Sequence, residues 1–489
     1  MPIDINFLIL VTLAAWHYAI RCGFISDDHA VLEQRLDIIP DEEKRPKKES
    51  YWLKAFNDGI VTFFINEVMT KLRLRKSPFA WHVLTLSLHI GNVVLLYKLL
   101  SSLLGEPVAM VSVLLWSINP MLNQVVVWIS GRPYSTAMLL CLVAMLNWQN
   151  PLIVIPLYML AVMTNISIAF VPVLLKIIHP QDWQTTLYVV IMFVAGFPYI
   201  GWKFYKRFTQ ALVIDRENFR WKNRRIFTLL RLYGYYIWTL CVPIRMGWYH
   251  QAGFRYNKKW ERFNFWTLIS TIVVAFILKH DIAAWWFLLG LFPNMNINAS
   301  NSFVQDRYVY FGSVGLAIIA AHYFTPYPIV VFCLVTFYAT RSYMYSRQMI
   351  DDEAMYRENW RNHPRSDYAV NNLSYFLIQQ HRYDEARVMI MRALEVSKDN
   401  KMLWYNLGIT YAAQGNLNND EGKFRFLKAL DCWKVCLQLE PRWSKPAEDM
   451  KKLVKLLVDN KVLTLDQTQS AMKGSPIDLP NLIGLGKET

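Results

Sequence analysis

The chain has 489 residues, of which 54% are hydrophobic, 15% aromatic and only 18% charged, and its formal net charge is +15. Soluble chains are typically about 45–50% apolar and about 25% charged. This composition excludes a disordered or a collagen-like protein and argues against an ordinary cytosolic enzyme. A basic surplus of this size is typical of proteins that meet nucleic acid or an anionic membrane surface.

The positive charge is concentrated in the apolar part of the chain. Residues 1–340 carry a net charge of +12, whereas residues 341–489 carry +3. In the first part the basic residues stand in short loops between apolar runs, which fits phosphate headgroups better than a nucleic-acid groove. No motif of an RNA- or DNA-binding domain is visible. We therefore expect membrane lipid as a partner and no nucleic acid.

The six cysteines lie mostly inside apolar runs and far apart. Cys432 and Cys436 are one helical turn apart, but no second Cys or His pair accompanies them. A structural zinc site needs four such ligands. The cysteines are therefore expected to be small buried hydrophobes, and no metal site is expected.

Long apolar stretches predict a protein that crosses the membrane many times. A spanning helix needs about 20 mostly apolar residues. The first stretch, Ile5–Ile20, lacks the basic start and cleavage site of a signal peptide, so we expect it to be an anchor. Eleven more apolar stretches follow before residue 340, several shorter than a full span, and predict about ten to twelve crossings. Trp285 and Trp286 match an aromatic belt at a membrane boundary. The predicted fold is all-α, with a polytopic membrane helical bundle over residues 1–345.

The orientation of this bundle is left open by its charges. The segment 203–225, interpreted as a loop, holds eight basic and two acidic residues. The positive-inside rule places such a loop in the cytoplasm. Counting crossings from a cytoplasmic N-terminus places it outside. Either one apolar stretch is miscounted, or the loop binds an anionic lipid on the outer face.

The composition changes after residue 345. Residues 346–366 are polar and helix-prone and are interpreted as a helical connector. Over 367–461 a period of 34 residues indicates tetratricopeptide (TPR) repeats with a capping helix, in which small residues lie where two antiparallel helices touch. Residues 462–489 form a C-terminal tail. The positions that define the second repeat are Trp404, Leu407, Gly408, Tyr411, Ala429 and Pro441.

Helical repeats of this kind stack into an α-solenoid with a concave surface that binds polypeptide. The tail is therefore expected to bind a protein partner or a protein acceptor. The alternative is a docking element that only braces the membrane part.

An acidic pair lies just beyond the first apolar stretch, in the sequence FISDDHAVLEQRLD. Two adjacent carboxylates, Asp27 and Asp28, are costly at a membrane boundary unless they are hydrated or used, and His29 follows them. They have two interpretations: a catalytic pair, or a helix N-cap in which Ser26, Asp27 or Asp28 caps a helix through residues 30–38. The polar loop continues to about residue 79 and includes an amphipathic stretch, Gly59–Arg75, expected to lie along the membrane interface.

Two further segments carry isolated charges between apolar runs. The first, Ser117–Thr136, contains Arg132 beside a glycine. The second, Ser302–Gly315, contains Asp306 and Arg307 at the mouth of an apolar stretch. An arginine near the membrane needs a partner, such as Asp306 or the interface itself. Its functional interpretation is a phosphate clamp, which a planar guanidinium suits.

The order of these features resembles a known family. An apolar span, the DD pair and a long loop are followed by SPFAWHVLTLSLHIGNVVLLYKLL, INP…ISGR, MTNISIAFVPVLL, DRYVYFGSVG and the repeat tail. This is similar to the transmembrane, TPR-containing O-mannosyltransferases, which belong to the GT-C class of polyprenyl-phosphate-sugar glycosyltransferases. The resemblance covers about residues 1–345 and the tail.

The resemblance implies roles for individual residues. Asp27 and Asp28 match the acidic pair of the first extracytoplasmic loop, here residues 24–79, and one of them would be the general base or would orient the acceptor. Arg307 and Arg132 match basic residues that would bind the phosphate of the donor lipid, and Asp306 stands where the family usually has Glu. His29 is a further candidate for contact with the acceptor or for support of the pair.

Several acidic or basic positions of the family are changed in this chain. Asn119 and Gln124 stand where the family has His and Glu, and they are retained as candidates for acceptor contact or support. Tyr134 replaces a final acid, and Thr164-Asn165-Ile166 replaces SKE. These changes bear on the substrate and on activity itself.

The resemblance thus implies an inverting membrane glycosyltransferase. Mannose or another hexose would move from a polyprenyl-phosphate donor to a protein or glycan hydroxyl, with no required cofactor and the need for a divalent cation left undetermined. The expected location is the bacterial inner membrane, or the endoplasmic reticulum if the source is eukaryotic. The alternatives are a catalytically inactive GT-C-like scaffold that assembles partners through its repeats, and a lipid or solute transporter.

Overall fold

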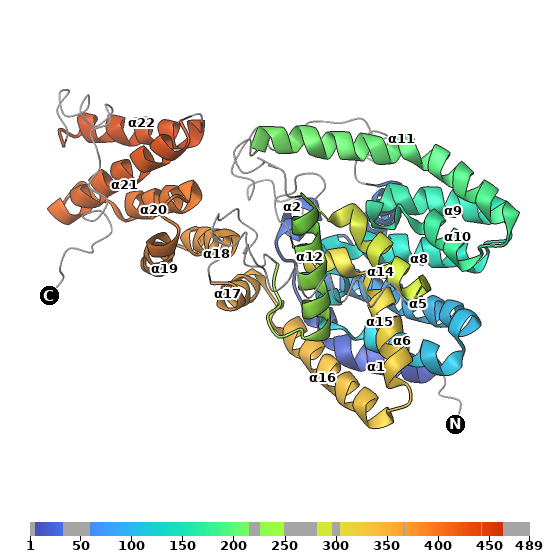
Figure 1. The fold of residues 1–489 in the computed structure, drawn as a ribbon. Helices are drawn as coiled ribbons and strands as arrows, with labels where there is room; N and C mark the ends of the chain where they lie inside the picture. The colour runs from blue at the N-terminus through green and yellow to red at the C-terminus, as the bar shows by residue number, and fades with distance from the viewer. Residues whose placement is uncertain are drawn as a thin grey trace. The chain divides into compact units, whose positions relative to one another are not determined.

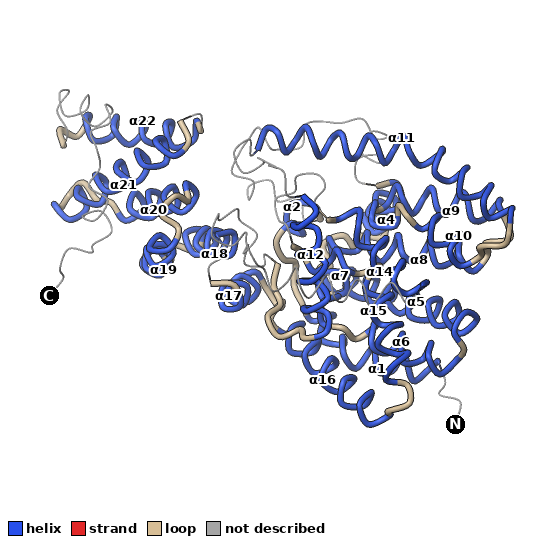
Figure 2. The backbone as a smooth tube through the Cα atoms, viewed as in Figure 1, coloured by secondary structure: helices blue, strands red, loops and turns tan. Residues whose placement is uncertain are grey.

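A computed structural model describes residues 5–32, 59–214, 225–248, 281–295, 304–364, 367–441 and 443–462. Every regular element in these residues is a helix, and Figure 2 shows helices and loops only. The chain forms two compact units, and the boundary between their main parts falls between Met355 and Tyr356. The all-helical part of the prediction is confirmed for these residues.

The first unit is built from α-helices joined by short 3-10 turns (Figure 1). Its helices are α1 (Ile5–Trp16), α2 (Asp27–Val31), α4 (Ile60–Lys71), α5 (Pro78–Leu104), α6 (Glu106–Ser117), α7 (Asn123–Val126), α8 (Arg132–Leu146), α9 (Pro151–Thr164), α10 (Val171–Ile178), α11 (Trp183–Ile214), α12 (Arg225–Cys241), α14 (Asp281–Leu291), α15 (Ser313–Phe324) and α16 (Pro328–Arg347).

Helix α5 is the centre of this unit, and it packs against α1, α6 and α8. The Ser77 hydroxyl accepts from the Ala80 N–H at 3.3 Å, Pro78 occupies the first turn, and Gly105 ends the helix at φ +83°. These are the usual start and stop signals of a helix. At 1.5 Å per residue, its 27 residues extend over roughly 40 Å, which exceeds the thickness of a bilayer core.

Three helical segments are long and apolar enough to cross a membrane: Pro78–Leu104, Ile129–Leu146 and Trp183–Lys203. A bent pair, Glu106–Ser117 with Pro120–Val126 at 56°, makes a fourth if it counts as one span. These are the segments found among the described residues, which also hold five shorter apolar helices. They indicate a membrane protein, and the ten to twelve crossings stay a prediction.

Helix α11 corrects the interpretation of segment 203–225 as a loop. Its residues 203–214 continue the helix, and residues 215–224 lie outside the described part. Lys203 lies over the rings of Tyr199 and Trp202, with its ammonium 5.5 and 5.3 Å from the two ring centres. The basic side chain is thus stabilised beside aromatic rings at the end of an apolar segment. Three of the eight basic residues of this segment, Lys203, Lys206 and Arg207, therefore belong to this helix.

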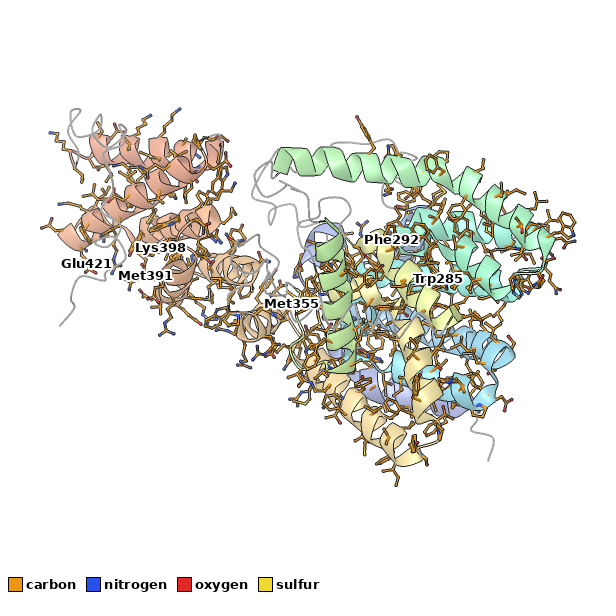
Figure 3. The ribbon with its side chains drawn as sticks, in the orientation of Figure 1. Trp285, Phe292, Met355, Met391, Lys398 and Glu421 are labelled. Atoms are coloured by element: carbon orange, nitrogen blue, oxygen red, sulfur yellow. The ribbon has the colours of Figure 1, made fainter. Side chains whose placement is uncertain are left out.

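The aromatic pair on α14 is divided between surface and core. Trp285, labelled in Figure 3, is 40% exposed, as a belt residue should be. Trp286 is fully buried, and its indole donates to the Phe311 carbonyl at 3.1 Å. The belt interpretation is therefore wrong for Trp286, because its side of α14 packs against Phe311 inside the unit.

A buried polar network ties five segments of this unit together. His89 Nε2 lies 2.9 Å from the Ser117 carbonyl, and His89 Nδ1 lies 2.8 Å from the Tyr310 hydroxyl. Asn92 donates to the same hydroxyl at 3.1 Å and to the Ser135 carbonyl at 2.9 Å. The indole of Trp16 donates to the Ser117 carbonyl. Since a carbonyl only accepts, Nε2 carries the proton and Tyr310 donates to Nδ1. The network fixes the segment around Tyr310 against α5.

The second unit contains most of α17 (Asp352–Asn362), α18 (Asp367–Gln379), α19 (Tyr383–Val396), α20 (Lys401–Gln414), α21 (Asp420–Leu439) and α22 (Ser444–Asp459). Each helix from α18 to α22 packs against the next one along the chain. Asn400 and Asn419 cap α20 and α21 through their side-chain oxygens. The assignment of these helices to TPR repeats stays a prediction.

Five of the six residues that define the second repeat lie in the core of this unit, and Pro441 is exposed. Trp404, Leu407 and Ala429 are fully buried or nearly so, and Tyr411 is 8% exposed. A Cβ atom on Gly408 would lie 2.3 Å from the indole nitrogen of Trp433, so α20 and α21 approach closely at this glycine. Helix α21 ends at Leu439, two residues before Pro441, and α22 follows where a capping helix is expected.

Candidate functional site

The acidic pair begins helix α2, and the preceding residue has an unusual backbone. Ser26 has φ +54°, in the left-handed region that residues other than glycine rarely adopt. Its side chain makes no capping hydrogen bond to α2. Instead, its backbone N–H donates to Asp352 Oδ1 at 2.7 Å. The N-cap interpretation therefore fails for Ser26, and residues 33–38 of the expected helix lie outside the described part.

Asp28 is fully buried, and Ser130 binds its carboxylate. The Ser130 backbone N–H donates to Asp28 Oδ1 at 2.9 Å, and the Ser130 hydroxyl donates to the same oxygen. The Ile25 N–H approaches Oδ2 at 3.4 Å. A buried charge needs such donors. The acidic pair of the first loop and the Ser117–Thr136 segment therefore meet at this carboxylate.

The protonation of Asp28 is balanced between burial and these donors. Burial raises the pKa of its carboxyl to about 7, while the Ser130 and Ile25 hydrogen bonds and the positive charge of Arg132 oppose the rise. Burial disfavours the charged form, and donors to the carboxylate favour it. At neutral pH the group is thus poised between its two states.

Asp27 differs from Asp28 because its side chain remains exposed to solvent. Desolvation by the surrounding chain raises the pKa of its carboxyl, and the positive charge of Arg307 opposes that rise. Asp27 therefore has what a proton acceptor needs: access for a second molecule and a pKa shifted towards neutrality. Its neighbour, Asp28, is closed to solvent.

Arg132, expected to bind a phosphate, has several partners inside the protein. It is 2% exposed, and its Nη2 donates to Asn66 Oδ1 at 2.7 Å. Its guanidinium lies 4.4 Å from the centre of the Trp81 ring. Gly131 allows this turn because a Cβ there would lie 1.9 Å from the Gln124 carbonyl oxygen. The structure thus places Arg132 as a buried counter-charge near Asp28.

Arg307 lies on an aromatic surface. Its guanidinium carbon is 4.9 Å from the centre of the Trp128 ring and 5.6 Å from that of Tyr308. Its backbone N–H and Nη1 approach Gln124 Oε1 at 3.4 and 3.5 Å. Because Gln124 is a neutral amide, this contact leaves the positive charge of the guanidinium in place. Trp128 also meets Trp248 edge to face, with ring centres 4.5 Å apart and ring planes inclined at 60°.

The remaining candidates are distributed around this centre. Asn119 donates to the Leu240 carbonyl at 3.1 Å and caps the following turn, so it binds the protein backbone. Gln124 donates to the Gly247 carbonyl at 3.2 Å. Asp306 is fully buried beside Arg307 in sequence. His29 Nε2 lies 3.0 Å from Asp352 Oδ2. His29 and Asn119 thus bind other parts of the protein.

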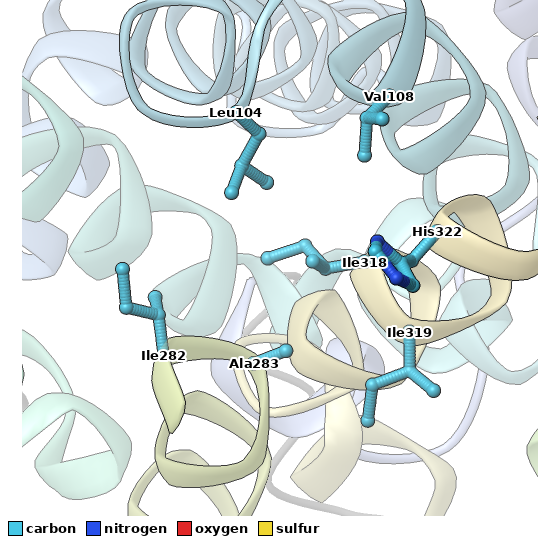
Figure 4. Close-up of a pocket in the computed structure, with 7 residues that line it drawn as sticks. All are labelled: Leu104, Val108, Ile282, Ala283, Ile318, Ile319 and His322. Atoms are coloured by element: carbon cyan, nitrogen blue, oxygen red, sulfur yellow. The ribbon is translucent and has the colours of Figure 1, made fainter. Parts of the chain in front are cut away.

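A separate cavity of about 240 Å³ lies between α5, α6, α14 and α15 (Figure 4). Its walls are aliphatic apart from one imidazole, His322. None of the candidate residues lines it. The lining residues are Leu104, Val108, Ile282, Ala283, Ile318, Ile319 and His322.

Within the described part of the chain, no group of three or more His, Cys, Asp or Glu side chains is arranged to hold a metal ion.

Four residues of the site were missed from the sequence: Ser130, Asn66, Trp128 and Asp352. Ser130 had a signal, because a Ser-Gly pair between apolar runs marks a turn next to Arg132. Trp128 lies in the same segment as Arg132 but reads as one more apolar residue. Asn66 lies in the stretch interpreted as an interfacial helix, Asp352 begins a polar helix, and only the fold brings them to the site.

Comparison with known proteins adds one distant relative. The protein O-mannosyl-transferase TMTC3 of Mus musculus aligns with this chain at 23% identity over 163 residues. The match covers 30% of this chain and 17% of the mouse protein. No family model and no solved structure matches the chain. The fold, the candidate membrane helices and this similarity together indicate a helical membrane protein with distant similarity to a glycosyltransferase.

Proposed function

We propose that this protein is an inverting membrane glycosyltransferase of the GT-C type, which transfers mannose or another hexose from a polyprenyl phosphate to a hydroxyl of a protein or glycan. The observation that carries this proposal is the convergence of three distant segments. The Asp27–Asp28 turn, the Ser130–Arg132 turn and Arg307 meet through the Ser130 bonds to Asp28 and the attraction between Asp27 and Arg307. A distant similarity to an O-mannosyltransferase supports the same class.

In the proposed reaction, Asp27 takes the proton of the acceptor hydroxyl. The acceptor oxygen then forms a bond to the anomeric carbon as the bond from that carbon to the phosphate oxygen breaks. Polyprenyl phosphate leaves with the electron pair, and the configuration at the carbon inverts. General-base catalysis of this kind contributes roughly 10²–10⁴-fold. Asp27 is preferred to Asp28 as the base because it is exposed.

Arg307 would stabilise the charge that develops on the leaving phosphate. Its guanidinium lies on Trp128 and Tyr308, which hold its plane, and its contact with Gln124 is to a neutral oxygen. Preorganised positive charge is usually the largest contribution to such a step. Arg132, which is buried on Trp81, would instead stabilise the ionised form of Asp28. Asp306 and Gln124 would hold the Arg307 segment. The scheme requires no metal ion, because the donor carries a single phosphate.

The C-terminal helices would recruit the protein acceptor or a partner through TPR-type binding. The enzyme would act as a multi-pass protein of the bacterial inner membrane or the endoplasmic reticulum.

Sugar transfer by the full-length protein in lipid nanodiscs tests the proposal. Polyprenyl-phosphate mannose serves as donor, and further hexoses are compared with it. We expect Asp27→Asn to lower kcat by at least about 100-fold and Arg307→Ala to weaken both donor binding and turnover. Arg21→Ala is the matched control. It removes an exposed cation between α1 and the acidic pair and should leave transfer intact.

A second candidate is a scaffold that keeps the fold without catalysis. Asn119 and Gln124, which replace ionisable residues of the family, make hydrogen bonds to backbone carbonyls, as purely structural residues would. A wild-type protein that binds no polyprenyl-phosphate sugar, in the same nanodiscs, would favour the scaffold. Full activity of Asp27→Asn would remove Asp27 as the base.

A further inference from the structure

A second acidic residue, far along the chain, binds the turn that carries the acidic pair. Asp352 Oδ1 accepts the Ser26 N–H at 2.7 Å, and Asp352 Oδ2 lies 3.0 Å from His29 Nε2. Ser26 and His29 flank the pair on both sides. A single carboxylate thus contacts the residue before Asp27 and the residue after Asp28, across more than 320 residues of sequence.

Two more contacts from the same stretch support this arrangement. The Gly23 N–H donates to the Ile350 carbonyl at 2.9 Å, and the Cys22 thiol lies 3.5 Å from the Ser346 carbonyl. The stretch from 346 to 352 therefore runs along the chain that leads into the acidic pair. All of these residues belong to the first unit.

The turn needs such support because its backbone is strained. Ser26 is held at φ +54°, a conformation that costs of order 1–3 kcal/mol in residues other than glycine and that persists where the surroundings enforce it. The Ser26 N–H is the group that Asp352 binds. Without that acceptor, the strained turn can relax, and Asp27 and Asp28 then lose the positions that leave Asp27 exposed and direct Asp28 at Ser130.

We propose that Asp352 is a positioning residue for the acidic pair: it holds the Ser26 turn through the Ser26 N–H and His29 and so fixes where the two carboxylates point. This inference rests on the proposed function for its effect on sugar transfer, but the contact itself can be tested without any activity. Asp352 touches neither reacting group, so its effect is expected in turnover and not in donor binding.

Three variants of the full-length protein in nanodiscs test this role. Asp352→Ala removes both acceptors. Asp352→Asn keeps Oδ1 for the Ser26 N–H, and its amide can donate to the neutral imidazole of His29. Asp351→Ala removes the neighbouring carboxylate, which stands just before α17 begins and whose Oδ1 accepts the Ala354 N–H at 2.8 Å, and is the matched control.

The first readout is hydrogen exchange of residues 22–32, measured by mass spectrometry. Asp352→Ala should speed exchange of this segment, whereas Asp351→Ala and Asp352→Asn should leave it close to wild type. Unchanged exchange in Asp352→Ala would overturn the proposal, whether or not the protein transfers sugar. If wild type transfers no sugar but exchange changes as expected, the proposed function fails and the holding of the turn by Asp352 stands.

The second readout separates kcat from KM. A misplacement of about 1 Å can cost roughly 100-fold in rate. We expect Asp352→Ala to lower kcat by about 10- to 100-fold with the donor KM within about 3-fold of wild type. Asp352→Asn should recover at least half of the lost turnover. Equal loss in the Asn and Ala variants, or a loss confined to KM, would contradict a positioning role.

Discussion

Ser130 donates both its backbone N–H and its hydroxyl to one oxygen of Asp28, across 102 residues of sequence. Two donors on one oxygen fix the plane of the carboxylate and favour its ionised form. Burial works in the opposite direction and is the larger effect, so the pKa of Asp28 rises to about 7 in spite of them.

The first prediction concerns the hydroxyl of Ser130. Ser130→Ala removes one donor to Asp28 and keeps the backbone N–H. A hydrogen bond to a charged group is worth about 1.5–3 kcal/mol, so the pKa of Asp28 should rise by about one to two units above its value of about 7. If the ionised carboxylate is needed to orient the acceptor, the acid limb of the kcat/KM profile moves to higher pH by the same amount.

The pH–rate profile of sugar transfer checks this prediction. Ser102→Ala is the control, because the Ser102 hydroxyl is exposed on α5 and bonds only the Leu99 carbonyl. An acid limb that stays in place in Ser130→Ala would show that Asp28 does not govern activity.

The second prediction concerns the stability of Asp28→Asn relative to wild type and how that difference depends on pH. The folded protein holds the Asp28 proton up to a pKa of about 7, whereas the unfolded chain releases it near 3.8. Between these values the folded state binds more protons, so the wild type loses stability as the pH rises. Asparagine resembles the protonated form and avoids this loss. At 1.36 kcal/mol per unit, the variant should be more stable by about 2–4 kcal/mol at pH 8.

Thermal unfolding in detergent at pH 5 and pH 8 checks the sign. The melting temperature of Asp28→Asn should exceed that of wild type at pH 8, and the difference should shrink at pH 5. A variant that is less stable than wild type at pH 8 would mean that Arg132 and Ser130 outweigh burial. Asp27→Asn, at the exposed neighbour, should show a smaller difference.

The sequence identified Asp28 and Arg307 because charged residues beside apolar runs are few and costly. It could not identify Asp352, which begins a polar helix where acids are ordinary, or Asn66, a single amide within the amphipathic helix α4. The partners of Asp28 and Ser26 lie 102 and 326 residues away, and periodicity contains no information on which turns meet. Composition predicted helices and membrane character, but it took residues 203–214 for a loop because their basic charge looked like loop charge.

Arg132 shows a second reason why a residue's role could not be predicted from the local sequence. The residue type is right for a phosphate clamp, and its place in the sequence agrees with that role. Its burial on Trp81 and its bond to Asn66 depend on α4 and α5 packing together, which the local sequence does not specify. The same amino acid can bind a ligand or a neighbouring side chain, and only the tertiary fold decides between them.

The third prediction concerns the buried hydroxyl of Tyr310. It donates to His89 Nδ1 at 2.8 Å and accepts from Asn92 at 3.1 Å. Tyr310→Phe removes the hydroxyl and leaves His89 Nδ1 and one N–H of Asn92 without a partner in a dry interior, which costs about 1–3 kcal/mol per group. We expect a clear fall in the melting temperature and weaker donor binding, because Tyr310 lies three residues from Arg307.

Tyr327→Phe is the matched control for this change. Tyr327 is 60% exposed, so the loss of its hydroxyl should leave the melting temperature within about 1 °C of wild type. Equal melting temperatures for Tyr310→Phe and wild type would mean that the network does not hold the segment in place.

The fourth prediction concerns the close approach of α20 and α21 at Gly408. A Cβ at this position would lie 2.3 Å from Nε1 and 2.6 Å from Cδ1 of Trp433, well inside contact distance. Trp433 is 4% exposed and its indole donates to the Tyr405 carbonyl at 3.3 Å, so it has little room to move away. Gly408→Ala should therefore cost about 1–3 kcal/mol, although alanine is the better helix former.

Gly201→Ala is the control, because a Cβ at position 201 meets nothing within 4 Å. This substitution should stabilise α11 by up to about 1 kcal/mol. Hydrogen exchange of residues 401–439 in the full-length protein measures the first effect. Faster exchange in Gly408→Ala, with Gly201→Ala unchanged in this region, is the expected result, and protection equal to wild type would mean that the two helices can separate without cost.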